Sequence, residues 1–224
     1  MRATIASACC AAAVLAAPAS ASVFIGGSLA APTLRVDAHG AAEVGWTEGG
    51  SRRYLVVPAT GEVFHGRLAG PDVSTPASAP GLPGVKVVRR GPGGTLWALQ
   101  AWQPAGRPAE LHLARWKGAP TQLTLADDGT HLTGQVTFQG RPVSGTSPTT
   151  AGKRMRIYVY LDCSGCAAGP GWTPMLGVAP RADGSFSVLL RPAWMGHEYR
   201  ASVEGPNLGA TLAPDAQAVV AAPS

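Results

Sequence analysis

Short runs in which apolar and polar residues alternate recur along the chain, separated by Gly, Pro and Asp-Gly pairs. A clear example is 134–138 (GQVTF), which leads into the turn-rich segment 139–145 (QGRPVSG). A period of two gives a strand one buried and one solvated face, and Gly, Pro and Asp supply the backbone angles of tight turns. The pattern therefore predicts an all-β fold of antiparallel strands.

In the first half of the chain, the alternation predicts a meander of strands joined by turns about eight to twelve residues apart. The expected strands are 34–36, 42–46, 53–57, 85–88, 95–102 and 109–116. Residues 71–83 between them are rich in proline, which has no N–H to donate to a sheet. We expect that stretch to be a loop or a connection between sheets.

In the second half, the same pattern predicts six strands and a seventh near the C-terminus. They are 122–125, 132–138, 154–162, 175–179, 185–190, 199–203 and 217–220. Seven short antiparallel strands in about 100 residues is the count of an immunoglobulin-like sandwich. With a boundary near Gly118–Pro120, the sequence predicts two antiparallel β domains, residues 22–118 and an immunoglobulin-like sandwich at 119–224.

Four elements carry a resemblance to a known class of module: Gly134-x-Val136, the Gly140-Arg-Pro-Val-x-Gly145 turn, the Asp183-Gly-x-Phe186 hairpin and Tyr199-Arg-Ala201. With them, residues from about 121 to 220 resemble the bacterial immunoglobulin-like and carboxypeptidase-regulatory-like β-sandwich modules of secreted proteins. Such modules act as spacers, displays or binding platforms, so the resemblance implies no reaction. Two insertions, 146–152 and 163–171, depart from the pattern.

The N-terminus has the organisation of a secretory signal peptide. Arg2 precedes an Ala-rich apolar run, and Ala19-Ser20-Ala21 provides an A-x-A cleavage site. The run is too short for a membrane-spanning helix, which needs about 20 apolar residues. We expect residues 1–21 to be removed, the mature protein to be secreted to the extracellular space, and no transmembrane segment to remain.

Composition and charge agree with a secreted β protein. The 224 residues include 29 Gly and 20 Pro, too many for long helices, and the formal net charge is +5. The cations are scattered, without the clustered basic element of a nucleic-acid reader. The sequence therefore predicts no nucleic-acid partner and favours an extracellular or cell-envelope ligand, protein or polysaccharide.

Cys163-Ser-Gly-Cys166 contains the two cysteines that would remain after signal cleavage. In an exported protein, such a pair is most simply a structural disulfide. A thioredoxin-like redox site would place the first cysteine at a helix N-terminus, which Gly169-Pro-Gly171 disfavours. A zinc site would need two further ligands, and the five histidines lack the usual spacing. The disulfide is the favoured hypothesis, with the redox and metal sites as alternatives.

The strand expected at 154–162 also offers a candidate ligand face. Its apolar residues share one parity, so the other face should carry Arg154, Arg156, Tyr158, Tyr160 and Asp162. An aromatic and charged stripe of this kind can stack sugars or contact peptides. An ordinary solvated strand face is the simpler interpretation, because Tyr has a high β propensity.

The chain contains no G-x-S-x-G, H-E-x-x-H, P-loop or G-x-G-x-x-G motif. The sequence therefore predicts a non-catalytic binding or display protein that needs no cofactor. Two alternatives remain. One is a secreted hydrolase with a site between the domains near His112, His197 and the acidic turns, and the other is a thiol-disulfide protein that uses Cys163 and Cys166.

Overall fold

The computed structural model describes residues 23–27, 30–59, 63–102, 110–149, 154–162, 172–208 and 211–221. Within these ranges the protein is built from antiparallel strands, and the helical elements are two three-residue 3₁₀ turns, η1 (Pro92–Gly94) and η2 (Pro192–Trp194). The predicted all-β antiparallel fold is confirmed. None of the described helical elements has the length and hydropathy needed to cross a bilayer.

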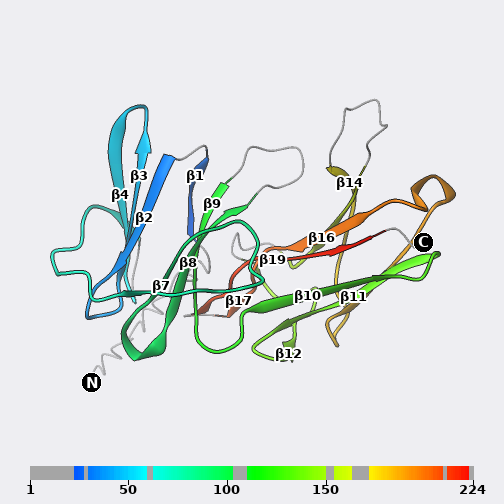
Figure 1. The fold of residues 1–224 in the computed structure, drawn as a ribbon. Helices are drawn as coiled ribbons and strands as arrows, with labels where there is room; N and C mark the ends of the chain where they lie inside the picture. Colours follow the sequence, from blue (N-terminus) through cyan, green and yellow to red (C-terminus); the bar gives the residue numbers. More distant parts are fainter. Residues whose placement is uncertain are drawn as a thin grey trace, which may run out of the picture.

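The first half forms two facing sheets (Figure 1). One has the order β2-β3-β4-β5, with β2 (Ala30–Val36), β3 (Ala42–Glu48), β4 (Ser51–Val57) and β5 (Phe64–His65). The other runs through β6 (Thr75–Pro76), β7 (Val85–Arg90), β8 (Leu96–Trp102) and β9 (Glu110–Trp116), and β1 (Val23–Gly27) also pairs with β9. A buried cluster between the two sheets, which includes Val44, Leu55 and Leu99, removes their apolar faces from water.

The second half is a second sandwich. Its first sheet contains β10 (Thr121–Asp127), β11 (His131–Phe138), β12 (Arg141–Pro142) and β15 (Ser185–Leu189), with β11 in the middle. Its other sheet has the order β14-β13-β16-β19, from β14 (Trp172–Val178), β13 (Ile157–Asp162), β16 (Tyr199–Val203) and β19 (Ala216–Val220). Val136 and Phe186 from one sheet and Ile157 and Val203 from the other meet in one buried cluster.

The two halves share a layer, because the sheet of β7, β8 and β9 is buried on both faces. Its odd-numbered residues, such as Trp97 and Leu113, belong to the core of the first sandwich. Its even-numbered Ala98, Ala114 and Trp116 belong to the cluster that continues into the second sandwich. Alternation along a strand is what allows one sheet to serve two cores.

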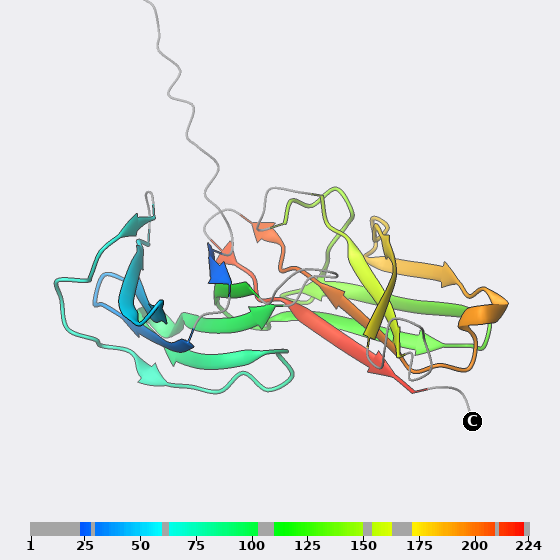
Figure 2. The same cartoon turned by 90° about the horizontal axis from the view of Figure 1, so that it is seen from above.

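The C-terminal part of the chain crosses between the halves. After β16, the short strands β17 (Asn207–Leu208) and β18 (Thr211–Leu212) join the first half, where Leu212 pairs with Arg115 of β9. The chain then returns along β19, beside β10 and β16 (Figures 1 and 2). We call residues 204–216 the return segment. It brings residues more than 100 positions apart into contact.

Every strand that the sequence predicts coincides with one in the structure, apart from small differences at the ends. The largest concerns 34–36, because β2 already begins at Ala30. In the strand predicted at 154–162, β13 begins at Ile157, and Arg154 makes only an isolated bridge with Pro148. The short strands β1, β5, β6, β12, β17 and β18 were not predicted, because two-residue strands carry no alternation and the apolar run of β1 adjoins the expected cleavage site. The division at residue 118 stays a prediction, and the signal peptide lies outside the described residues.

Candidate functional site

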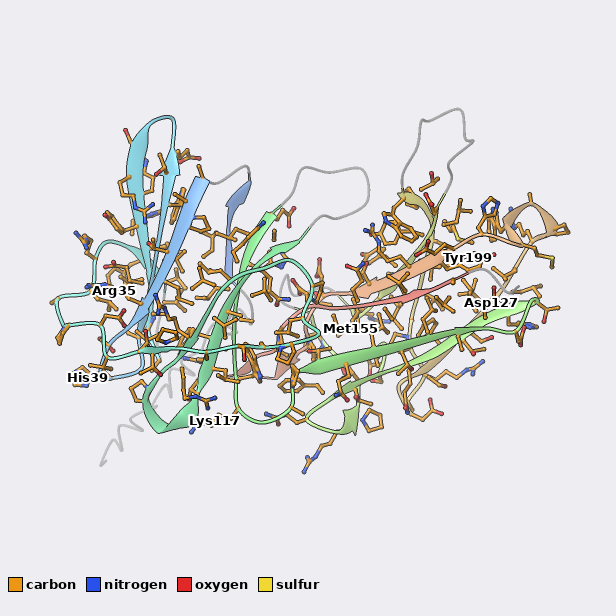
Figure 3. The ribbon with its side chains drawn as sticks, viewed as in Figure 1. Arg35, His39, Lys117, Asp127, Met155 and Tyr199 are labelled. Carbon is orange, nitrogen blue, oxygen red and sulfur yellow. The ribbon has the colours of Figure 1, made fainter. Side chains whose placement is uncertain are left out.

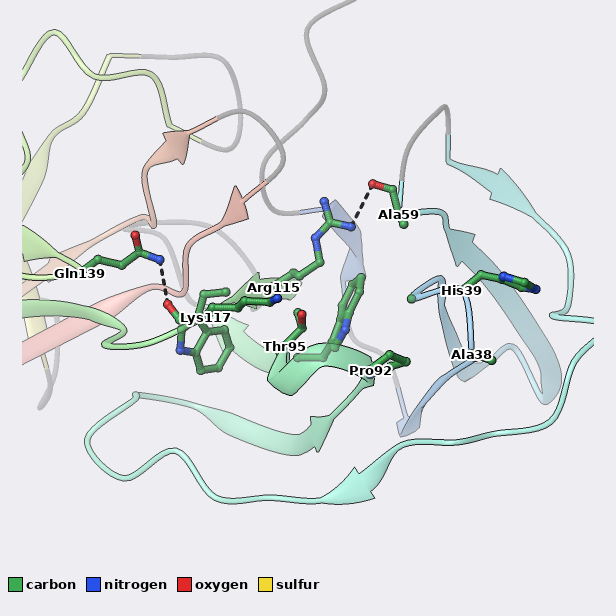
Figure 4. Close-up of a pocket in the computed structure, with 11 residues that line it drawn as sticks. Ala38, His39, Ala59, Pro92, Thr95, Arg115, Lys117 and Gln139 are labelled. Atoms are coloured by element: carbon green, nitrogen blue, oxygen red, sulfur yellow. Dashed lines mark hydrogen bonds between the residues drawn. The ribbon is translucent and has the colours of Figure 1, made fainter.

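A cavity of about 490 Å³ lies where turns of the first half meet the β11–β12 turn of the second (Figure 4). We call it the junction cavity. Its walls come from the β2–β3 turn, the end of β4, the η1 turn and the end of β9, with one residue from the second sandwich. The lining residues are Ala38, His39, Gly40, Ala59, Pro92, Thr95, Trp97, Arg115, Trp116, Lys117 and Gln139.

Arg115 is held on one wall of the junction cavity. Its guanidinium lies 5.2 Å from the centre of the Trp97 ring, and its Nη1 donates a hydrogen bond of 3.2 Å to the carbonyl of Ala59. Burial lowers the pKa of Arg115, because a partly desolvated site disfavours the charged form. The cation is therefore fixed in place and sits in a less polar environment than water.

Lys117 extends along a neighbouring wall towards Thr95 (Figure 4). Its ammonium lies over the η1 turn, where a Cβ added to Gly93 would stand 3.3 Å from Nζ. The carbonyl of Lys117 accepts a 2.7 Å hydrogen bond from Nε2 of Gln139. Gln139 has a φ of 52° and is followed by Gly140 with a φ of 73°, the backbone of a two-residue hairpin turn.

The floor of the junction cavity is aromatic but scarcely accessible. Trp97 and Trp116 are each 1% exposed. A sugar platform needs open ring faces, so these two indoles cannot provide one. His39 lies at the rim and is exposed, and it falls on the same side of the molecule as Lys117 (Figure 3). The chemistry that a ligand would meet is cationic and polar, above an apolar base.

A second polar cluster is buried between β8, β9 and the return segment. Nδ1 of His112 lies 3.0 Å from Oδ2 of Asp215, and Nε2 lies 3.2 Å from Oε2 of Glu110. The Gln100 side chain makes two hydrogen bonds with the backbone of Asp215. Nε2 of Gln100 donates to the Asp215 carbonyl at 3.2 Å, and Oε1 of Gln100 accepts from the Asp215 N–H at 3.0 Å. Oδ1 of Asp215 accepts from the N–H of Gly205 at 2.9 Å.

This cluster favours the charged form of His112. Burial alone would lower the pKa of the imidazole, but the hydrogen bond and charge of Asp215, helped by Glu110 and Glu204, outweigh it and raise the pKa. A general base needs a ring nitrogen with a free lone pair, whereas both nitrogens here face carboxylate oxygens. His112 does not line the junction cavity, and it is 4% exposed. The geometry suits a buried ionic link better than a catalytic base.

The structure does not gather the predicted ligand face into one site. The apolar parity holds, since Met155, Ile157 and Val159 are fully buried. The residues predicted for the outer face lie in different surroundings. Arg154 and Arg156 are exposed and line a cavity of about 340 Å³ at one end of the second sandwich. Tyr158 is half-buried. Tyr160 is 2% exposed, and Asp162 lies at the far end of β13.

Tyr160 is buried because Arg200 covers it. The Arg200 guanidinium stands 4.6 Å from the Tyr160 ring centre and 4.9 Å from that of Trp172, a cation between two aromatic rings. Burial lowers the pKa of Arg200. The alternation along β13 predicts that Tyr160 lies on the outer face of the sheet. It cannot predict that Arg200, on the neighbouring strand β16, covers the ring.

The remaining sequence candidates are placed as follows. Cys163 and Cys166 lie outside the described residues, so their pairing stays a prediction. Asp128 accepts hydrogen bonds from the N–H groups of Thr130 and His131, as expected of a turn carboxylate, and these bonds lower its pKa to about 2.

His197 is the other histidine named for a hydrolase site, and its Nδ1 lies 3.1 Å from the carbonyl oxygen of Asp162. Among the described residues, no three His, Cys, Asp or Glu side chains are grouped as metal ligands would be.

Comparison of the chain with models of known protein families, with curated proteins and with solved structures finds no match.

Sequence reasoning named His112 but missed its partner Asp215 and Gln100, which binds the backbone of Asp215. A signal existed, because Gln100 interrupts an otherwise apolar strand and His112 lies between two leucines of the next one. Polar residues in such positions need buried partners. The partner itself lies 103 residues from His112. The walls of the junction cavity also come from five separate turns or strand ends. Because these segments are far apart in the sequence, no local motif could predict the cavity.

Proposed function

We propose that the protein is a secreted, non-catalytic binding or display protein of the cell surface or extracellular space. The junction cavity carries this proposal. Its described lining contains cations, one hydroxyl and amide groups, but no carboxylate beside a histidine and no activated nucleophile. Such a lining can hold a ligand and has no general acid or base pair to transform it.

The second half supports the display part of the proposal. Its sheets have the orders β10-β11-β15 and β14-β13-β16-β19, which match the A-B-E and C′-C-F-G arrangements of immunoglobulin-like sandwiches. Tyr199 opens β16, and its hydroxyl donates to the carbonyl of Trp194, as in the tyrosine corner of that fold. These features favour the immunoglobulin-like resemblance.

The hydrolase alternative depends on His112. Its contacts with two carboxylates resemble part of a catalytic triad, but a triad histidine keeps one nitrogen for its nucleophile. The thiol-disulfide alternative depends on Cys163 and Cys166. It predicts that a mild thioredoxin-strength reductant reduces the pair reversibly, whereas a structural disulfide resists it.

One experiment tests binding against hydrolysis. The mature protein is incubated with the culture medium and a detergent extract of the envelope of its own cells, then recaptured, and the retained compounds are analysed by mass spectrometry. The proposal expects retained compounds of unchanged mass. A compound of cleaved mass that disappears with His112→Gln, in a variant whose thermal unfolding shows that it is folded, would instead establish the hydrolase, and an empty capture would contradict the binding proposal.

A further inference from the structure

The charged residues in the described lining of the junction cavity are cations. Among its described lining residues, Arg115 and Lys117 carry positive charge, while none carries negative charge. The nearest acidic residue on the β2–β3 turn, Asp37, is turned away into its own loop, where Oδ1 accepts from the N–H groups of His39 and Ala41 at 2.9 Å each. A cleft lined by one sign of charge concentrates counter-ions.

The two cations differ in how firmly they are held. Arg115 is backed by the Trp97 ring and anchored on the Ala59 carbonyl. Lys117 is exposed and follows directly after β9, and the Gln139 amide fixes its backbone carbonyl rather than its ammonium. A positioned charge such as that of Arg115 loses less side-chain entropy on binding than a free one, so it favours recognition.

The volume of the cavity and its uncharged lining residues limit the size and polarity of the ligand. The cavity volume of about 490 Å³ lies within the range of small-molecule sites. Ala38, Ala59 and Pro92 give apolar walls, and the Thr95 hydroxyl lies near the tip of Lys117 (Figure 4). Because both indoles are 1% exposed, recognition must use charge and shape rather than stacking on an aromatic platform.

We propose that the junction cavity binds a small organic anion, whose carboxylate, phosphate or sulfate group contacts Lys117, Arg115 and Thr95 while its apolar body lies against Ala59 and Pro92. This inference deepens the proposed binding function and depends on it. Lys117 supplies the exposed charge that meets the ligand first, and Arg115 supplies the planar donor group suited to an oxyanion.

Isothermal titration of the mature protein with anionic probes and their neutral counterparts tests the inference. The probes are benzoate and phenyl phosphate against benzyl alcohol, and galacturonate against galactose, each up to about 5 mM. We expect the anions to bind, the neutral compounds not to bind, and the affinity to fall as salt is raised. The aromatic and sugar arms distinguish the source of the anionic group.

Variants locate the site. Lys117→Gln should weaken anion binding about tenfold, because it removes a charged hydrogen-bond donor. Lys117→Arg should retain it. Lys86→Gln is the matched control, since Lys86 is an exposed lysine of β7 outside the cavity and its loss changes the net charge equally. Thermal unfolding of each variant confirms that the fold is intact.

Three outcomes would overturn the inference: no anion binds, neutral and anionic probes bind equally, or Lys86→Gln weakens binding as much as Lys117→Gln. None of these contradicts the broader proposal. The broader proposal fails when recapture from medium and envelope retains nothing, or retains compounds whose cleavage depends on His112.

Discussion

His112 and Asp215 are separated by 103 residues, yet Nδ1 of the imidazole lies 3.0 Å from Oδ2 of the carboxylate, and both residues are buried. The contact joins a strand of the first half to the return segment. Because Gln100 also clasps the backbone of Asp215, the return segment is fixed by polar bonds as well as by packing. Any separation of the halves must break this buried link.

We predict that Asp215→Asn lowers the free energy of unfolding by about 3 kcal/mol, because it leaves a buried imidazolium without its main counter-charge. Urea denaturation followed by tryptophan fluorescence measures the change. Glu198→Gln is the control, since Glu198 is exposed, and its replacement should change the stability by less than about 0.5 kcal/mol. Equal stabilities of the two variants would show that the link contributes nothing.

The same link predicts a pH dependence. The pKa of His112 is raised in the folded protein, so the charged form stabilises the fold fully below the ordinary pKa of 6.5, and this contribution is lost as pH rises through the folded value. We expect the difference in unfolding free energy between the natural protein and His112→Gln to be larger at about pH 6 than at about pH 9. A difference that is constant or grows with pH would contradict the assignment.

Tyr199 offers a test of the tyrosine corner. Its ring is fully buried, and burial together with the charge of Asp127 raises the pKa of the phenol, which keeps the hydroxyl as a donor to Trp194. Tyr199→Phe removes only that oxygen and should cost about 1 to 2 kcal/mol, because the partly buried Trp194 carbonyl loses its hydrogen-bond donor. Tyr158→Phe is the control, as Tyr158 is half-buried on the neighbouring strand. Chemical denaturation that gives the same midpoint for both would argue against the corner.

The alternating pattern was enough to predict most of the longer strands, because each of these needs only its own residues to define a buried face. It predicted the inward residues of β13 for the same reason. It could not predict what covers an outer face, as Arg200 covers Tyr160, or what a polar residue on a buried face will meet, as Asp215 meets His112. Those contacts depend on how sheets stack and where the chain returns.

Gly134 and Phe186 show how two of the sequence elements that carry the resemblance depend on each other. They are paired across β11 and β15, and a Cβ added to Gly134 would stand 2.1 Å from the Thr124 carbonyl oxygen and 2.5 Å from the Phe186 ring. The missing side chain lets the ring lie over the strand and lets β10 approach. A glycine inside a strand often marks such a close approach.

We therefore predict that Gly134→Ala destabilises the protein by about 3 kcal/mol, because both a backbone oxygen and a buried ring must move. Gly177→Ala is the matched control: Gly177 also lies within a strand, but its nearest neighbour would be an ordinary 3.5 Å contact with Tyr158. That substitution should be neutral or slightly stabilising, since alanine restricts the unfolded chain. Thermal unfolding midpoints compare the two directly. If Gly134→Ala were as stable as Gly177→Ala, the close packing of Phe186 on β11 would be wrong.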